Sequence, residues 1–196
     1  MGGRGNSGIS RGKQLSHEDW DWWSEDPSVF QRLEKGEDLR EYFQEQYDED
    51  EWEDLYQEAS AIAREMGIRA ESETLNTNTL YRGERFSSLE EAQKKFAVGK
   101  TITTGQLTSY SKDLDLARGY ATMYGNSRVA VVITNTSTTG KFTATQANHS
   151  GYANKSNDPE VIVKRGFESK VTNTRYDKKN NILYVTMTNS VKPKRR

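Results

Sequence analysis

The hydrophobic pattern of this chain changes character near Gly67. Before that residue, large apolar side chains recur at roughly helical spacing, whereas short apolar runs typical of strands follow it. Two or three short helices are expected over residues 16–46, where Ser16 forms an N-cap ahead of acidic residues. A further helix is expected from residue 52, with Gly67 as its stop. We expect the aromatic faces of these helices to form core rather than a ligand platform.

The second part of the chain predicts a mostly β core. Val129 to Thr134 is a continuous apolar run, as in a strand buried on both faces. The other elements expected are strands at Leu80 to Gly83 and Val161 to Val163, a hairpin of Lys170 to Tyr176 with Ile182 to Thr188, and helices at Leu89 to Phe96 and Leu114 to Met123. Helices followed by strands, without an internal repeat, indicate an α+β fold.

The composition limits the classes of protein. A chain of 196 residues supports one domain with a real core and a small helical addition. It has no cysteine, and His17 and His149 are its two imidazoles, so we expect neither disulfides nor a structural metal. There is no secretory h-region or long apolar stretch, which favours a soluble, cytoplasmic protein that does not enter a membrane.

Charge divides the chain into three sections. Residues 1–15 are rich in glycine, with arginine among them, and are expected to form a flexible arm, or alternatively an arm that binds a partner or nucleic acid. We expect residues 16–67 to form an acidic helical section packed on the core, and residues 68–196 to form that core, which carries the candidate site residues described below. The stretch 16–66 has 18 Asp and Glu against 4 Lys and Arg, whereas 67–196 has 11 against 21. The basic part would suit a polyanion, although charge alone identifies no partner.

An arginine and a glycine end the first expected strand, as Leu80-Tyr81-Arg82-Gly83. The guanidinium of Arg82 offers a fixed fork of donors that matches a pyrophosphate or ribose edge, and Gly83 would let a ligand approach the backbone. The alternative is a surface arginine paired with Glu84 or another carboxylate.

A second motif is Ser109-Tyr110-Ser111, followed by a helical pattern that includes Tyr120. The period of a strand places both serines on one face and Tyr110 on the other. Ser111 is expected to cap the following helix, with Asp113 in its first turn. A plain strand end with an N-cap is the alternative.

The third motif, Asp158-Pro159-Glu160, opens an apolar strand. Asp158 and Glu160 share a face, about 7 Å apart along the strand, so both carboxylates can enter one site. Pro159 is tolerated at a strand start. An acidic strand end facing solvent is the alternative.

In this order, the three motifs resemble the Arg, Ser-Thr-Ser and Glu-x-Glu signatures of toxin-like mono-ADP-ribosyltransferases of bacterial or phage type. The resemblance covers about residues 75–190. Tyr110 replaces the usual Thr, and Asp158 replaces the usual Glu or Gln. The resemblance implies two packed, mostly antiparallel sheets around an NAD cleft. NAD is then a consumed substrate, and no metal is required.

The resemblance also implies a role for each site residue. Glu160 holds the ribose 2′-OH and stabilises the ribosyl cation, Ser109 orients Glu160, and Arg82 holds the phosphate or ribose side. Gly83 binds the carboxamide through its backbone. The remaining implied residues are Ser111 in NAD binding, Tyr120 stacking on nicotinamide, Asp158 at the acceptor, and Tyr152, Asn154 and Asn157 in the acceptor-recognition loop.

The resemblance therefore implies an enzyme that cleaves NAD and transfers ADP-ribose to a macromolecule. A protein arginine is the leading acceptor, and a nucleic-acid base is the alternative. A toxic transferase acting where it is made would need a neutralising partner. The other interpretations are a phage-associated, non-catalytic protein on the same fold and a nucleic-acid-binding module.

Overall fold

The computed structural model describes residues 14–149 and 160–190. A capping box starts the first helix, because Ser16 and Asp19 each accept the backbone N–H of the other. No helix in these residues is both long enough and apolar enough to span a bilayer. The helices are α1 (His17–Glu25), α2 (Pro27–Glu34), α3 (Arg40–Gln46), α4 (Trp52–Ser72), α5 (Leu89–Lys95) and α6 (Leu114–Thr122), followed by the 3₁₀ turn η1 (Gly125–Ser127).

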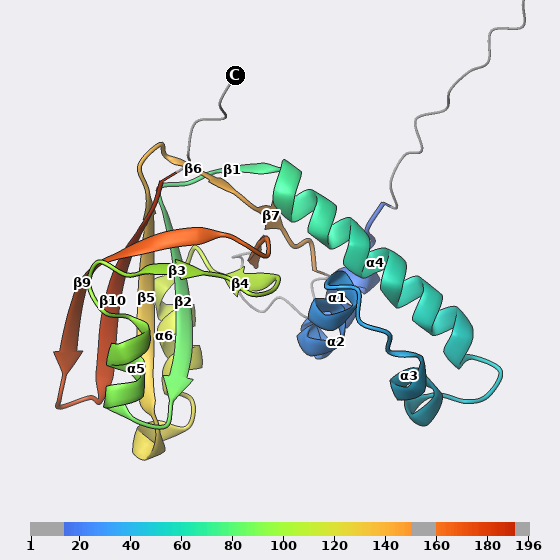
Figure 1. Cartoon of the computed structure of the whole chain (residues 1–196), viewed down its shortest axis with the longest axis horizontal. Helices are drawn as coiled ribbons and strands as arrows, with labels where there is room; N and C mark the ends of the chain where they lie inside the picture. Colours follow the sequence, from blue (N-terminus) through green and yellow to red (C-terminus); the bar gives the residue numbers. More distant parts are fainter. Residues whose placement is uncertain (1–13, 150–159, 191–196) are drawn as a thin grey trace, which may run out of the picture.

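The strands form a five-stranded sheet in the order β2-β5-β10-β9-β3, a three-stranded sheet in the order β4-β8-β7, and the ribbon β1-β6. Figure 1 shows the helices α1 to α4 to one side of the five-stranded sheet. The strand bounds are β1 (Thr74–Asn76), β2 (Thr79–Phe86), β3 (Thr101–Thr103), β4 (Thr108–Tyr110), β5 (Val129–Ser137), β6 (Lys141–Thr143), β7 (Thr145–Gln146), β8 (Val161–Val163), β9 (Glu168–Asp177) and β10 (Ile182–Asn189).

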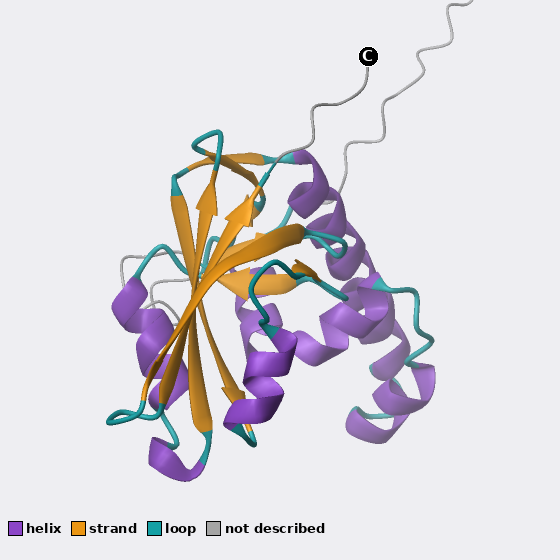
Figure 2. Cartoon of the chain, turned by 60° about the vertical axis from the view of Figure 1, so that its left-hand side comes forward, coloured by secondary structure: helices purple, strands orange, loops and turns teal. Residues whose placement is uncertain are grey.

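The five-stranded sheet is covered by one helix on each face. Ala92 of α5 belongs to the same core cluster as Val131, whereas Ala121 of α6 clusters with Val132, the next residue of β5. Successive residues of a strand point to opposite faces, so α5 and α6 lie on opposite sides of the sheet, as Figure 2 also shows. The last strand, β10, lies inside the sheet, parallel to β5 and antiparallel to β9.

The three-stranded sheet joins the helical section to the rest of the molecule. Ile162 of β8 is fully buried in the same cluster as Trp23, Phe30 and other residues of the helices. Its neighbours Val161 and Val163 face the other way, into a cluster with residues of β2 and β6. The helices and this sheet therefore share one core.

The structure confirms the α+β class and the expected helices and strands, with β2 longer than predicted. The short strands β1, β3, β6 and β7 were not predicted. The expected stop at Gly67 is wrong, because α4 continues to Ser72, and the domain boundary expected after residue 67 falls inside this helix. A Cβ on Gly67 would lie 3.1 Å from Cγ of Glu34, so this glycine allows α2 to pass close to α4.

A second glycine lies where a helix meets the sheet. A Cβ on Gly83 would come within 2.2 Å of the carbonyl oxygen of Ala117 and 2.8 Å of the amide nitrogen of Ala121. Both atoms belong to the backbone of α6, which cannot swing aside as a long side chain would. The absence of a side chain at Gly83 is thus required by helix packing.

We predict that Gly83→Ala lowers the free energy of unfolding by about 1–3 kcal/mol or more, because β2 and α6 must separate. The control is Gly119→Ala on α6, where an added Cβ meets nothing within 4 Å. An alanine in a helix interior should raise stability there by up to about 1 kcal/mol. Denaturant unfolding of both variants measures the difference, and equal behaviour would contradict the close contact.

Candidate active site

Glu160 lies immediately before β8, opposite the strand that carries the serine motif. Ser109 pairs with Ile162 across β4 and β8. Alternation along β8 gives Glu160 and Ile162 the same face, toward the helical section. The hydroxyl of Ser109 donates a short hydrogen bond to Oε1 of Glu160. Thus two residues 51 positions apart, predicted to meet from the motifs, are in contact.

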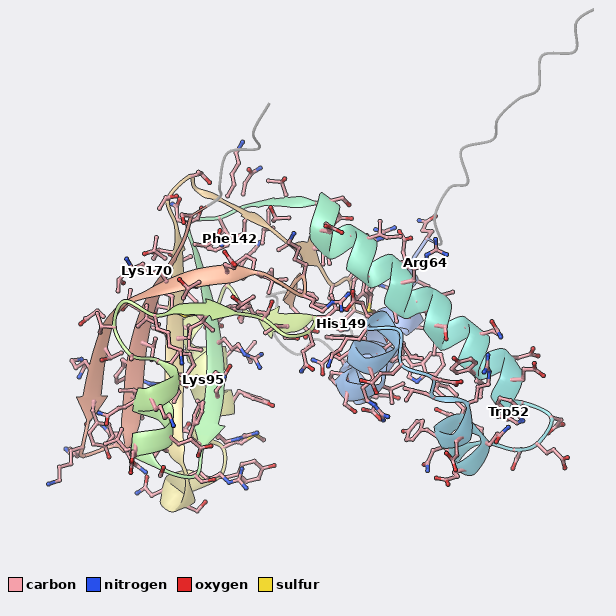
Figure 3. The ribbon with its side chains drawn as sticks, viewed as in Figure 1. Trp52, Arg64, Lys95, Phe142, His149 and Lys170 are labelled. Atoms are coloured by element: carbon pink, nitrogen blue, oxygen red, sulfur yellow. The ribbon has the colours of Figure 1, made fainter. Side chains whose placement is uncertain are left out.

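Two further donors reach the same carboxylate. The indole Nε1 of Trp23, from α1, donates to Oε1 of Glu160 at 3.2 Å, and Nε2 of His149 lies 3.0 Å from Oε2. The Trp23 side chain is fully buried, and the His149 side chain is 7% exposed. Figure 3 shows His149 between the helices and the five-stranded sheet.

Three side-chain donors of the described residues converge on the carboxylate of Glu160. An ionised carboxylate has about four lone-pair positions. Among the described residues, Ser109 and Trp23 donate to Oε1 and His149 to Oε2 of Glu160. These described donors reach both oxygens of the Glu160 carboxylate.

The surroundings keep Glu160 ionised. Burial tends to raise the pKa of its carboxyl, but hydrogen bonds from His149, Ser109 and Trp23 outweigh burial and hold the pKa below its usual value. The hydrogen bond to Glu160 raises the pKa of His149, and contact with Asp21 adds to that effect against the opposing burial.

Arg82 connects the sheet to the serine strand. Its Nη1 donates to the backbone carbonyl of Ser109 at 2.7 Å, and its Nε donates to Glu84 at 3.1 Å. Glu84 also pairs with Lys95 of α5 at 2.9 Å. The pairing with Glu84 considered from the sequence is therefore present, and Arg82 also reaches the backbone beside the Glu160 site.

The rest of the serine motif is partly as predicted. Tyr110 points away from Ser109, into the core beside Phe167. The expectation that Ser111 caps α6 is wrong. Asp113 is the N-cap, since its carboxylate accepts from the first amides of the helix, and Ser111 accepts from the amide of Asp113. Asp and Ser are comparable N-caps, and Asp113 takes this role because it is the residue directly before Leu114, where the helix begins.

Two residues predicted to bind NAD have other neighbours. The side-chain position of Gly83 is filled by α6, so packing accounts for this glycine without a ligand. Tyr120 is 55% exposed, and the guanidinium of Arg85 lies 4.7 Å from its ring centroid. Arg85 shares a face of β2 with Gly83, so Tyr120 lies on the opposite side of that strand from Arg82. The structure does not bring Tyr120 to Glu160.

Several predicted positions cannot be placed. Asp158, Tyr152, Asn154 and Asn157 lie outside the described residues. Within residues 14–149 and 160–190, no group of His, Asp or Glu is arranged to hold a metal ion.

Trp23 and His149 were not predicted as site residues. Trp23 was assigned to the core by its helical spacing, and His149 was considered only as a metal ligand. The available signal was weak: His149 is one of two histidines and comes 11 residues before Glu160. Trp23 comes 137 residues before Glu160, and sequence spacing does not reveal such a contact.

Solved structures with a similar fold are ADP-ribosyltransferases. Vis toxin from Vibrio splendidus superposes with a TM-score of 0.56 and 16% identity, over 91% of this chain and 75% of the toxin chain. The ATR domain of Salmonella SpvB superposes with a TM-score of 0.55 and 12% identity, over 90% of this chain and 99% of that domain. An ADP-ribosyltransferase from Clostridium botulinum superposes with a TM-score of 0.53 and 14% identity, over 90% of this chain and 88% of that protein. Vis has also been solved in complex with agmatine, with a TM-score of 0.55 and 16% identity over 94% and 79%.

A scan of protein-family models and a search of curated proteins give no match. The chain thus has the fold of the toxin-type mono-ADP-ribosyltransferases. The resemblance stated from the three motifs is confirmed at the level of the fold.

The pKa of His149 predicts how stability depends on pH. A folded-state pKa above the unfolded value of about 6.5 stabilises the fold fully below that value, and the gain is lost as pH rises through the folded pKa. We expect the free energy of unfolding to fall as pH rises from about 6.5 through the raised folded-state pKa of His149, and to fall less in His149→Gln. Urea unfolding of both proteins at a series of pH values measures this free energy. The same pH dependence in both proteins would contradict a raised pKa for His149.

Proposed function

We propose that this protein is a mono-ADP-ribosyltransferase that cleaves NAD, releases nicotinamide and transfers ADP-ribose to a macromolecule. The observation that carries the proposal is Glu160, a largely buried carboxylate kept ionised and oriented by Ser109. A carboxylate held in this way is suited to accept a hydrogen bond from a ribose hydroxyl. The transferase fold and the nearby Arg82 support the same activity.

The chemistry assigns a role to each of these residues. Cleavage of the bond between nicotinamide and ribose C1′ builds positive charge on the ribose, as in glycoside hydrolysis. The negative charge of Glu160 stabilises that cation, and Ser109 fixes the carboxylate. Arg82 holds a phosphate or ribose edge of NAD. Nicotinamide leaves a cationic pyridinium as a neutral molecule, so its departure requires no Lewis acid.

A protein arginine is the proposed acceptor. Asp158 precedes Glu160 by two residues, the position at which the resembled family contacts its acceptor, and would act on a guanidinium there. Vis has been solved with agmatine, which carries a guanidinium group. Agmatine is therefore a suitable small acceptor with which to begin.

The test is the release of nicotinamide from NAD by purified protein, with and without agmatine. Glu160→Gln keeps the shape but removes the charge, and turnover should fall by roughly 10²–10³. The control is Glu90→Gln, an exposed position on α5, which should leave turnover unchanged. No cleavage by the unaltered protein would favour the non-catalytic alternative, and an active Glu160→Gln would remove Glu160 from the site.

A nucleic-acid base is the second candidate acceptor, favoured by the surface around α6. Arg85 lies 4.7 Å from the ring centroid of Tyr120 and 4.5 Å from that of Tyr124, and both tyrosines are more than half exposed. On the β10 side of the helix, Arg118 donates to the hydroxyl of Tyr184. Exposed aromatic rings among arginines are typical of surfaces on which single-stranded bases stack.

Labelled NAD in a lysate distinguishes the two acceptors. Label that survives nuclease and is lost to protease supports a protein acceptor. Label lost to nuclease supports a nucleic acid, and transfer should then fall steeply between roughly 50 and 200 mM salt. Replacing Tyr120 and Tyr124 by alanine should also lower transfer in that case, whereas Ile68→Ala, a truncation of an exposed side chain on α4, should not.

A further inference from the structure

His149 links carboxylates from two distant parts of the chain. Its Nε2 lies 3.0 Å from Glu160 at the start of β8, and its Nδ1 lies 3.3 Å from Oδ1 of Asp21 on α1. The proposed chemistry at the ribose uses Glu160 but gives no role to His149 or Asp21. The hydrogen-bonded Asp21–His149–Glu160 chain therefore has no function in that chemistry so far.

The geometry favours one protonation state of the His149 ring. A neutral imidazole carries one N–H and one lone pair, so one of its nitrogens would present a lone pair to a carboxylate oxygen. Protonation on both nitrogens lets the ring donate to Asp21 and Glu160 together. Two carboxylates facing one buried ring thus favour the imidazolium.

We propose that His149, held as an imidazolium by Asp21, is a positioning residue that fixes the ionised carboxylate of Glu160 in its reactive orientation. This inference rests on the proposed NAD cleavage. His149 acts through Glu160 and need not touch the substrate. The acidic helical section would then contribute to the active site through Asp21 and Trp23, both on α1.

The charges around the site are consistent with this role. Asp21, His149 and Glu160 together carry one negative charge, so the imidazolium does not cancel the charge that faces the ribosyl cation. Uncharged side chains also contact this group: Ser24 lies 3.4 Å from Nε2 of His149, and Trp23 and Ser109 donate to Glu160. The remaining histidine, His17, contacts the carbonyl of Asn148 rather than the His149 ring.

A pH dependence follows. As pH rises through the raised pKa of His149, the ring loses a proton and can donate to only one of its two carboxylates. Glu160 then loses part of its orientation, although it remains ionised. The kcat/KM for NAD cleavage, which reports on the free enzyme, should fall on the alkaline side.

The first test does not depend on activity. The chain has two histidines, so an NMR titration gives two ring signals, and His17→Gln assigns them. The pKa of His149 should be above about 6.5 in the unaltered protein. It should drop in Asp21→Asn and in Glu160→Gln. A value at or below about 6.5, or one that neither variant changes, would overturn the proposal.

The second test is the pH profile of kcat/KM for NAD cleavage. His149→Gln keeps an N–H donor but does not titrate, so it should retain much of the activity and lose the alkaline decline. His149→Leu removes the donor and should cost about 10- to 100-fold, the worth of a hydrogen bond to a charged group. Asp21→Asn should move the decline to lower pH. Thermal unfolding of each variant confirms that it is folded.

The outcomes separate this inference from the proposed function. An unchanged alkaline decline in folded His149→Gln would overturn the role of His149 and leave NAD cleavage intact. Absence of NAD cleavage in the unaltered protein, with a raised pKa for His149, would overturn the proposed function. In that case the Asp21–His149–Glu160 chain would be a structural contact only.

Discussion

The site depends on keeping one carboxylate charged inside the protein. Removing the charge of Glu160 from water is unfavourable, and it becomes tolerable because hydroxyl, indole and imidazole donors converge on the two oxygens. Ser109 comes from the neighbouring strand, Trp23 from the first helix, and His149 from the segment after β7. Because these donors come from widely separated positions in the sequence, the carboxylate has its surroundings only after the helical section has joined the three-stranded sheet.

This requirement explains the arrangement of the helical section. Ile162 of β8 is buried among the helices, and alternation along the strand places Glu160 on that same side. The contact between the helices and β8 thus buries apolar surface and also brings the indole N–H of Trp23 to Glu160. The sequence divides into an acidic part and a basic part by charge. The structure does not divide there, because the hydrophobic core and the hydrogen bonds of Glu160 contain residues from both parts.

Local patterns predicted the elements, and motifs predicted one contact. The apolar run of β5, the terminal hairpin and the helices α5 and α6 follow from residue spacing, because neighbours in the sequence determine them. The contact of Ser109 with Glu160 was available only through family resemblance. The contacts of Trp23 and His149 with Glu160 depend on the packing of α1 against β8, which local sequence patterns do not determine. The helix stop at Gly67 was wrong because α4 continues to Ser72, and the side chain next to this glycine is Glu34 on another helix.

The position of β10 has a consequence for the synthesis of this protein. This strand, residues 182–189, is the last in the sequence, yet it lies between β5 and β9 and pairs with both. A nascent chain lacking it has two separated halves of the sheet, and long-range pairing of this kind forms slowly. The five-stranded sheet, which carries Arg82 on β2, can therefore close only after β10 has left the ribosome. Until then, β2 and β5 remain separated from β9 and β3.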